Sequence, residues 1–280
     1  MARVSEEAKR KYSEKIKVYK KKIDDQLQSE QQILQMLKSD DKGAGYKKLM
    51  LANETLNVVS YYLLMNELSL ALLGIKNDAY INEGRKACFK ALIYLEEVFS
   101  DYLDVPYSEY EDKLEEVSGF SDDDRFNLIR KIGFSIDAIN TAFGEGSKWK
   151  WSFVDMNGRL AVVAKNCMDL KKMAAGMDPR VPGYQTRLKQ LNLTRRLLQQ
   201  SADDFRKKYE LSTFRIDDFK RAIGFLASLK RLSIVLKRNS DVEALKKKID
   251  IWKQKMDTDL KRMEDKQKRA RLEAGPSEES

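Results

Sequence analysis

The sequence has no histidine, and its 280 residues include only two cysteines and four prolines. Without imidazole, the protein cannot form a Ser–His–Asp triad, a histidine zinc site or the Glu-x-x-His pairs of di-iron bundles. An all-β protein needs a turn residue about every eight to twelve positions, and 4 prolines with 13 glycines are too few. These absences predict a mostly helical chain and exclude many hydrolases and metalloenzymes.

A secretory signal and a long uncharged hydrophobic run are also missing. Residues 1–22 are charged throughout and lack the apolar stretch of a signal peptide. The most apolar run, 58–73, is shorter than the about 20 residues that span a bilayer and carries Asn66 and Glu67 in its middle. Cys88 and Cys167 lie in apolar stretches, which is typical of small core residues. We therefore expect a cytoplasmic protein without membrane insertion.

Charge, in contrast, is abundant and unevenly spread. Residues 1–50 carry 13 basic and 8 acidic side chains, residues 51–179 carry 14 and 21, and residues 180–280 carry 26 and 15. The densest acidic block, 96–124, has twelve carboxylates and one lysine. Basic ends thus flank an acidic middle. This distribution is equally compatible with self-association, within or between chains, and with attraction of an outside polyanion.

Apolar residues recur at three- and four-residue steps over most of the chain, as in amphipathic helices. The pattern predicts an all-α fold, an elongated bundle of about eight helices in one domain over 1–272. A soft division is expected near 144–147, and the small polar tail 273–280 should be disordered. The eight long helices are expected at about 5–38, 46–76, 78–103, 122–143, 148–176, 184–209, 219–237 and 240–272.

Two capping boxes are predicted in the acidic block. Ser108 with Glu111 would start a short helix, and Ser121 with Asp124 would start the helix 122–143. Along that helix, the apolar residues expected to face inward are Phe126, Ile129, Ile132, Phe134, Ile136, Ile139 and Phe143.

The first and last helices have narrow apolar seams and wide charged faces. The last helix has a heptad-like seam of candidate partner-binding residues, followed by Leu260 and Met263: Val242, Leu245, Ile249, Trp252 and Met256. A helix with a narrow seam can pack its apolar side chains against only one neighbouring helix. The first and last helices could pair with each other, or each could lie along the central bundle, or they could be left for a partner. Of these, we expect the seam of the last helix to be buried against the first helix or against another chain.

Two further surfaces are candidates for binding nucleic acid. Trp149 and Trp151, interleaved with Lys148 and Lys150, could stack on bases, although packing of the rings on the bundle is the favoured interpretation. The helix 184–209 carries a basic surface that could contact phosphates: Arg187, Arg195, Arg196, Lys207 and Lys208. Acidic residues are interspersed, which is more typical of a solvated helix face.

Two groups of carboxylates could do chemistry. Asp122, Asp123 and Asp124 could bind a hard cation, but consecutive helical positions point in different directions, which favours a simple helix start. Glu67 lies in an apolar helix, and a buried acid must be paired, neutral or functional. An ion pair with Arg85 or Arg159 is the favoured expectation for Glu67.

No catalytic constellation, metal site, cofactor motif or small-molecule site emerges from the sequence. We therefore expect a non-enzymatic helical scaffold or adaptor that binds other proteins, or itself, through its terminal helices and charged surfaces. The alternative is a nucleic-acid-binding protein that uses the basic C-terminal half. A weaker possibility is an enzyme with an unfamiliar carboxylate site around Glu67.

Overall fold

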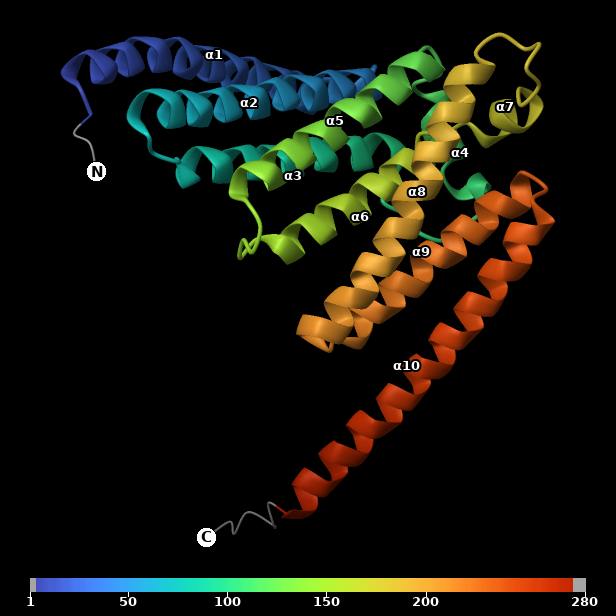
Figure 1. Ribbon diagram of the computed structural model, residues 1–280. Helices are drawn as coiled ribbons and strands as arrows, with labels where there is room; N and C mark the ends of the chain where they lie inside the picture. The colour runs from blue at the N-terminus through green and yellow to red at the C-terminus, as the bar shows by residue number, and fades with distance from the viewer. Residues whose placement is uncertain (1–3, 274–280) are drawn as a thin grey trace. The chain divides into compact units, whose positions relative to one another are not determined.

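The computed structural model describes residues 4–273, of which none lies in a strand, and the chain is 83% helical. The predicted all-α fold is confirmed. The predicted disordered tail lies, apart from Glu273, outside the described residues. The described part contains ten α-helices and two short segments (Figure 1): α1 (Glu6–Ser39), α2 (Ala44–Leu73), α3 (Asp78–Phe99), η1 (Tyr107–Glu109), α4 (Glu111–Glu115), α5 (Asp122–Phe143), α6 (Lys150–Asn166), α7 (Leu170–Ala175), α8 (Tyr184–Lys208), η2 (Tyr209–Thr213), α9 (Ile216–Val235) and α10 (Asn239–Glu273).

The chain divides into two compact units, 1–197 and 198–280, and the boundary falls inside α8. The glycine-rich segment 144–147, where a soft division was expected, connects α5 to α6 within the first unit. Whether the two units fold as one domain stays a prediction.

The first unit is built around α2, which packs on α1, α3 and α5. Its apolar side chains point in most directions, so it needs neighbours on several sides. Left-handed glycines at both ends limit α2, with φ +68° at Gly43 and +67° at Gly74. The helix ends at Leu73, three residues before the predicted end. Among the described helices, α2 is long and apolar enough to cross a membrane, a test that the core helix of a bundle also passes.

The second unit contains the end of α8, the π-helical segment η2, α9 and α10. Aromatic rings form its core. Tyr209 stacks on Phe219 with ring centroids 4.9 Å apart, and Phe219 lies 6.0 Å from Trp252 of α10. Phe205 and Phe225 pair at 5.4 Å between α8 and α9. These contacts join three helices into a small core of their own.

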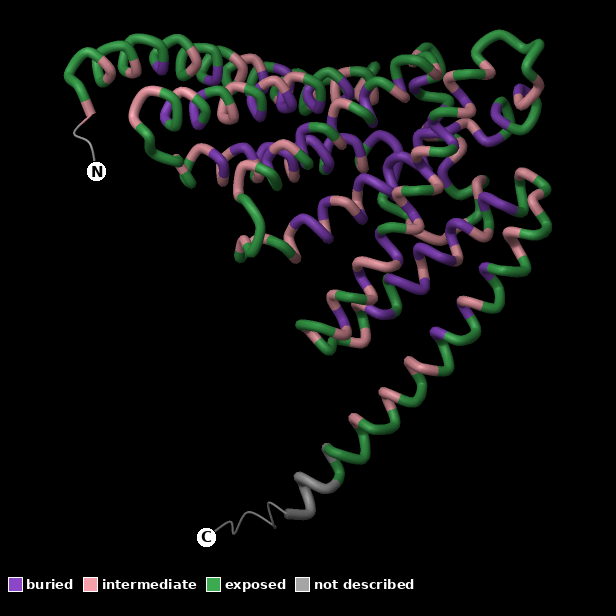
Figure 2. The backbone as a smooth tube through the Cα atoms, in the orientation of Figure 1, coloured by how far each residue is buried: buried purple, intermediate pink, exposed green. Residues whose placement is uncertain are grey.

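The seam predicted on α10 is covered by α9. The expectation that the first helix or a second chain covers it is therefore wrong, and the alternative, packing along another helix of the bundle, is what the described residues show. Leu245, Ile249 and Trp252 are buried, whereas Val242 and Met256 are half-buried. Most other positions of α10 are exposed, as Figure 2 shows. The seam therefore serves the core of the second unit.

Three predicted helix boundaries are wrong by several residues. The helix expected over 78–103 ends at Phe99, where Ser100 takes a positive φ of 73°. The expected helix 148–176 is broken at residues 167–169, where the Asp169 side chain accepts a hydrogen bond from the Lys172 N–H and starts α7. Ser108 lies in the turn η1 and caps no helix, because α4 begins after Tyr110 without a side-chain cap. At Asp169 a polar side chain close to a turn, rather than apolar periodicity, sets the boundary.

Candidate functional site

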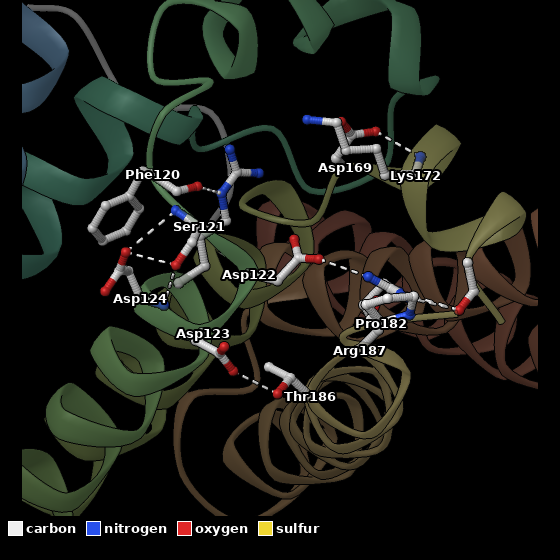
Figure 3. Close-up of polar contacts among 12 residues, drawn as sticks. Phe120, Ser121, Asp122, Asp123, Asp124, Asp169, Lys172, Pro182, Thr186 and Arg187 are labelled. Carbon is white, nitrogen blue, oxygen red and sulfur yellow. Dashed lines mark hydrogen bonds and ion pairs between the residues drawn. The ribbon is translucent and has the colours of Figure 1, made fainter. Parts of the chain in front are cut away.

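Polar side chains gather at the N-terminus of α5 (Figure 3). Ser121 and Asp124 form the predicted capping box, with the Asp124 N–H donating to Ser121 Oγ at 3.1 Å. Asp122 lies 3.2 Å from Arg187, and Asp123 accepts a hydrogen bond from Thr186 at 2.5 Å. Each aspartate is thus engaged by the protein. No group of acidic or cysteine side chains in the described part of the chain could hold a metal ion.

Arg187, predicted on a basic surface, is buried instead, with 8% of its surface exposed. Its guanidinium donates to the carbonyl oxygens of Gly176 at 3.1 Å and Pro182 at 2.7 Å, besides its contact with Asp122. A Cβ at Gly176 would lie 2.6 Å from Arg187 Nε, so glycine is needed there for the close approach. Arg187 holds the α7–α8 connection on α5 and is not available to phosphates.

The other members of the predicted basic surface differ in their surroundings. Lys208 forms an ion pair with Asp218 at 3.3 Å, with both side chains largely covered. Lys207 pairs with Asp204 at 3.4 Å on the surface. Arg195 is half-buried and Arg196 is exposed. The five residues therefore do not form one open cationic surface, and their role in binding nucleic acid stays a prediction.

A second buried arginine, Arg125 on α5, was not singled out from the sequence. It donates to the carbonyl oxygens of Phe120 and Cys167, both at 2.9 Å. The signal was its position on the apolar face of α5, three and four residues before Leu128 and Ile129. Burial raises the pKa of the neighbouring Cys167 thiol to about 12, so this cysteine is a core residue and not a nucleophile.

The predicted aromatic–basic patch at the start of α6 is partly packed. The Arg85 guanidinium lies 3.8 Å from the centroid of the Trp149 ring, and Phe143 lies 6.2 Å from the same ring. Lys148 lies over Trp149 and Lys150 over Trp151, at 5.3 and 5.0 Å. Trp149 is thus in contact with the bundle, in line with the favoured interpretation. Stacking of bases on this patch stays untested.

Glu67 is exposed, so the expectation of a buried, paired acid there is wrong. The candidate partner Arg159 pairs with Glu96 instead, with Nε 2.6 Å from Oε1. The buried carboxylate of this unit is Glu30 of α1, which is 8% exposed and accepts hydrogen bonds from Lys90 and Tyr94 of α3. A heptad signal could have found it, since Glu30 follows Ile16 and Ile23 at seven-residue steps.

Several carboxylates of the acidic block 96–124 form ion pairs with lysine or arginine side chains of the first unit. Besides the Glu96–Arg159 pair, Glu97 lies 3.0 Å from Lys48 of α2, and Glu111 pairs with Lys171 of α7. Part of the charge separation seen along the sequence is therefore neutralised inside the chain.

A groove of about 410 Å³ lies between α2 and α5. Tyr46 and Met50 of α2 line it and are 43% and 45% exposed, and Leu128 of α5 is buried beside it. Lys131 donates to the side-chain oxygens of Asn53 at 2.6 Å and Asn57 at 2.9 Å, and burial lowers the pKa of this lysine. The amide oxygens satisfy the ammonium group, which leaves the groove mainly apolar.

Phe134 extends this apolar surface and corrects a prediction, because it was expected to face inward and is 74% exposed. It follows Asn127 and Lys131, which line the groove, at steps of seven and three residues on α5. Leu64, 43% exposed, stands on the same side of α2 as Tyr46, eighteen residues or five full turns away. We call Tyr46, Met50, Leu64 and Phe134 the α2–α5 face. The face extends over about 27 Å of α2, and large exposed apolar side chains that share one side of a helix pair are typical of interaction surfaces.

The fold and its groove define an all-α helical-bundle protein, and comparison with known proteins places the chain more closely. The chain belongs to the TP0443 family, whose model matches residues 8–260. No curated protein matches it. A chain from the computational design of self-assembling cyclic protein homooligomers is similar at 10% identity, covering 92% of this chain and 99% of that chain, with a TM-score of 0.29. A likeness this weak carries no argument about fold or assembly.

Proposed function

We propose that the protein is a non-enzymatic cytoplasmic adaptor that binds a partner protein, and that the α2–α5 face receives the apolar side of an amphipathic helix of that partner. The observations that carry this proposal are the groove of about 410 Å³ and the 74% exposed ring of Phe134, which follows the groove residue Lys131 by three residues on α5. Grooves between two helices commonly receive a third, whose apolar side chains are spaced three and four residues apart. Met50 adds a flexible side chain that can adapt to its partner.

The terminal helices, where partner binding was expected from the sequence, are the weaker candidates for this surface. The seam of α10 is already covered by α9, and α1 buries its own seam on the first unit. Their outer faces carry single exposed apolar residues, such as Met36 and Ile251. Single exposed apolar residues are normal on protein surfaces and call for no partner.

Site-specific photo-crosslinking of the full chain tests the proposal. A benzophenone amino acid at position 134 should crosslink to one protein, through a peptide with apolar residues at helical spacing. The same group at the exposed position 140, on another face of α5, is the matched control. Met50→Asp should abolish the product and leave the free energy of unfolding within about 0.5 kcal/mol, because Met50 is exposed.

Equal products from positions 134 and 140 would contradict the proposal. So would a product from position 134 that contains nucleic acid, which would favour the alternative function of nucleic-acid binding.

A further inference from the structure

A cavity of about 260 Å³ lies among α1, α2 and α3, apart from the α2–α5 face. Its walls combine apolar side chains, including Leu51, Val58 and Ala87, with carboxylates. One buried water needs only about 10–15 Å³ of such space, so the cavity has room for a larger guest. The exposed Lys86 lies among its lining residues.

Three carboxylates and two ammonium groups line the cavity, and each ammonium group forms an ion pair with one of the carboxylates. Lys90 is paired with Glu30, and Lys86 lies 2.7 Å from Glu83. The third carboxylate, that of Glu54 on α2, has no ion pair among the described residues. The ionisable groups of the cavity therefore leave one negative charge without a partner.

Two acceptor atoms on residues that line this cavity are unsatisfied, and as the side chains stand neither is open to a water molecule. Oε2 of Glu54 and Oε1 of Gln26 have no hydrogen-bond partner among the described residues. A buried acceptor without a donor is unfavourable, and more so when it is charged. Proteins resolve such sites with a bound water or with a ligand that brings its own donors.

We propose that this cavity binds an alkylammonium group, with the ammonium at Glu54 and Gln26 and the alkyl stem along Leu51, Val58 and Ala87. An ammonium group carries three donors and a positive charge, which matches the unpaired carboxylate of Glu54 and the unsatisfied oxygen of Gln26 once these side chains turn towards the guest. An anion would be repelled by these groups. A metal ion lacks a ligand set, since the described residues hold no suitable cluster.

The proposal is tested on the full chain by saturation-transfer NMR with n-pentylamine hydrochloride and, as the uncharged control of equal stem length, 1-pentanol. At pH 7 the amine should bind about tenfold or more tightly than the alcohol, because only the amine brings a charged donor. This comparison needs no variant. Equal binding of the two probes overturns the proposal, since the cavity would then select an alkyl chain without its charge. No binding of the amine also overturns it and leaves a cavity that holds water only.

Matched variants on α2 locate the site. Glu54→Gln keeps the shape of the side chain and removes its charge, and it should weaken binding of n-pentylamine about tenfold or more. Glu67→Gln removes an exposed carboxylate from the same helix and should leave binding unchanged. Equal loss in both variants overturns the proposal, since it would show attraction to net charge alone.

Two sources could supply the alkylammonium group. Spermidine represents a free polyamine, and an acetylated, amidated Gly-Lys-Gly peptide represents a lysine side chain of a protein. Displacement of n-pentylamine by either probe supports the proposal and identifies the source. Displacement by neither overturns it. The outcome is independent of the α2–α5 face, because Met50→Asp leaves this cavity intact.

Discussion

The two terminal helices, α1 and α10, have nearly equal lengths of 34 and 35 residues, and each buries a narrow seam. In α1 the seam is interrupted by a carboxylate, since Ile16 and Ile23 are followed by Glu30. In α10 the buried positions Leu245, Ile249 and Trp252 are all apolar. The first helix therefore needs polar partners from α3 and has a cavity beside it, whereas the last helix closes an aromatic core. The single carboxylate in the seam of α1, that of Glu30, thus distinguishes the interface of α1 from the apolar interface of α10.

The largest effect should come from truncating the aromatic anchor of α10. Trp252→Ala should destabilise the second unit by about 3–5 kcal/mol, because this buried ring packs beside Phe219 and its removal leaves a cavity there. Scanning calorimetry of the full chain should show a lowered transition for this unit and an unchanged transition for the first.

The counterpart in α1 is Ile23→Ala, at a position 5% exposed, like Ile249 of α10. It should cost about 2–5 kcal/mol and lower only the transition of the first unit. A single transition shifted by both variants would mean that the chain unfolds as one domain, as the sequence predicts. The stabilities contributed by α1 and α10 could then not be compared unit by unit.

A smaller effect is expected from the polar position of the α1 seam. Glu30→Gln should cost about 1–3 kcal/mol, since it removes the charge that accepts from Lys90 and Tyr94. Urea unfolding measures this change. Glu67→Gln, at an exposed position, should stay within about 0.5 kcal/mol of the wild type. Similar values for the two variants would mean that Glu30 is not a distinctive feature of the α1 interface.

The smallest effect should appear at alkaline pH. Burial, with the hydrogen bond to Asp259, raises the pKa of Tyr209 from 10.0 to about 12. Its contribution to stability is present below pH 10 and is lost as the pH rises towards 12, because the unfolded chain then ionises more readily. Tyr209→Phe should flatten this decline for the second unit, as followed by urea unfolding between pH 9 and 11.

Tyr94, beside Glu30, provides the matching test on the first unit. Burial and the Glu30 carboxylate raise its pKa in the same direction. Tyr94→Phe should flatten the alkaline decline of the first unit and leave that of the second unchanged. The reverse assignment would contradict the placement of these two tyrosines in separate cores.

Much of the fold was predictable because helix formation is governed by nearby residues. Apolar spacing and caps such as Ser5, Asn77 and Ser121 set the starts of α1, α3 and α5. The break at Asp169 was missed because its cap interrupts a continuous apolar pattern. Periodicity alone does not show where a side chain competes for the backbone.

The candidate sites were less predictable, because exposure depends on contacts between distant segments. Phe134 has the spacing of a core residue, and no neighbouring helix covers it in the described part of its unit. Arg187 reads as one of many surface cations, but the turn 176–183 wraps around its guanidinium. Neither the exposure of Phe134 nor the burial of Arg187 can be predicted from the residues adjacent to it in its own helix.

The sequence by itself determined the all-α class, the main helices and the absence of imidazole chemistry, since composition and local spacing are sufficient for these. Only the tertiary structure decided that α9 covers the α10 seam, that Glu30 rather than Glu67 is buried, and that Phe134 is exposed. The physical reason is that a helix specifies which of its faces is apolar, whereas the elements packed against that face decide what is covered. Those elements lie tens of residues away, as Lys90 and Tyr94 do from Glu30.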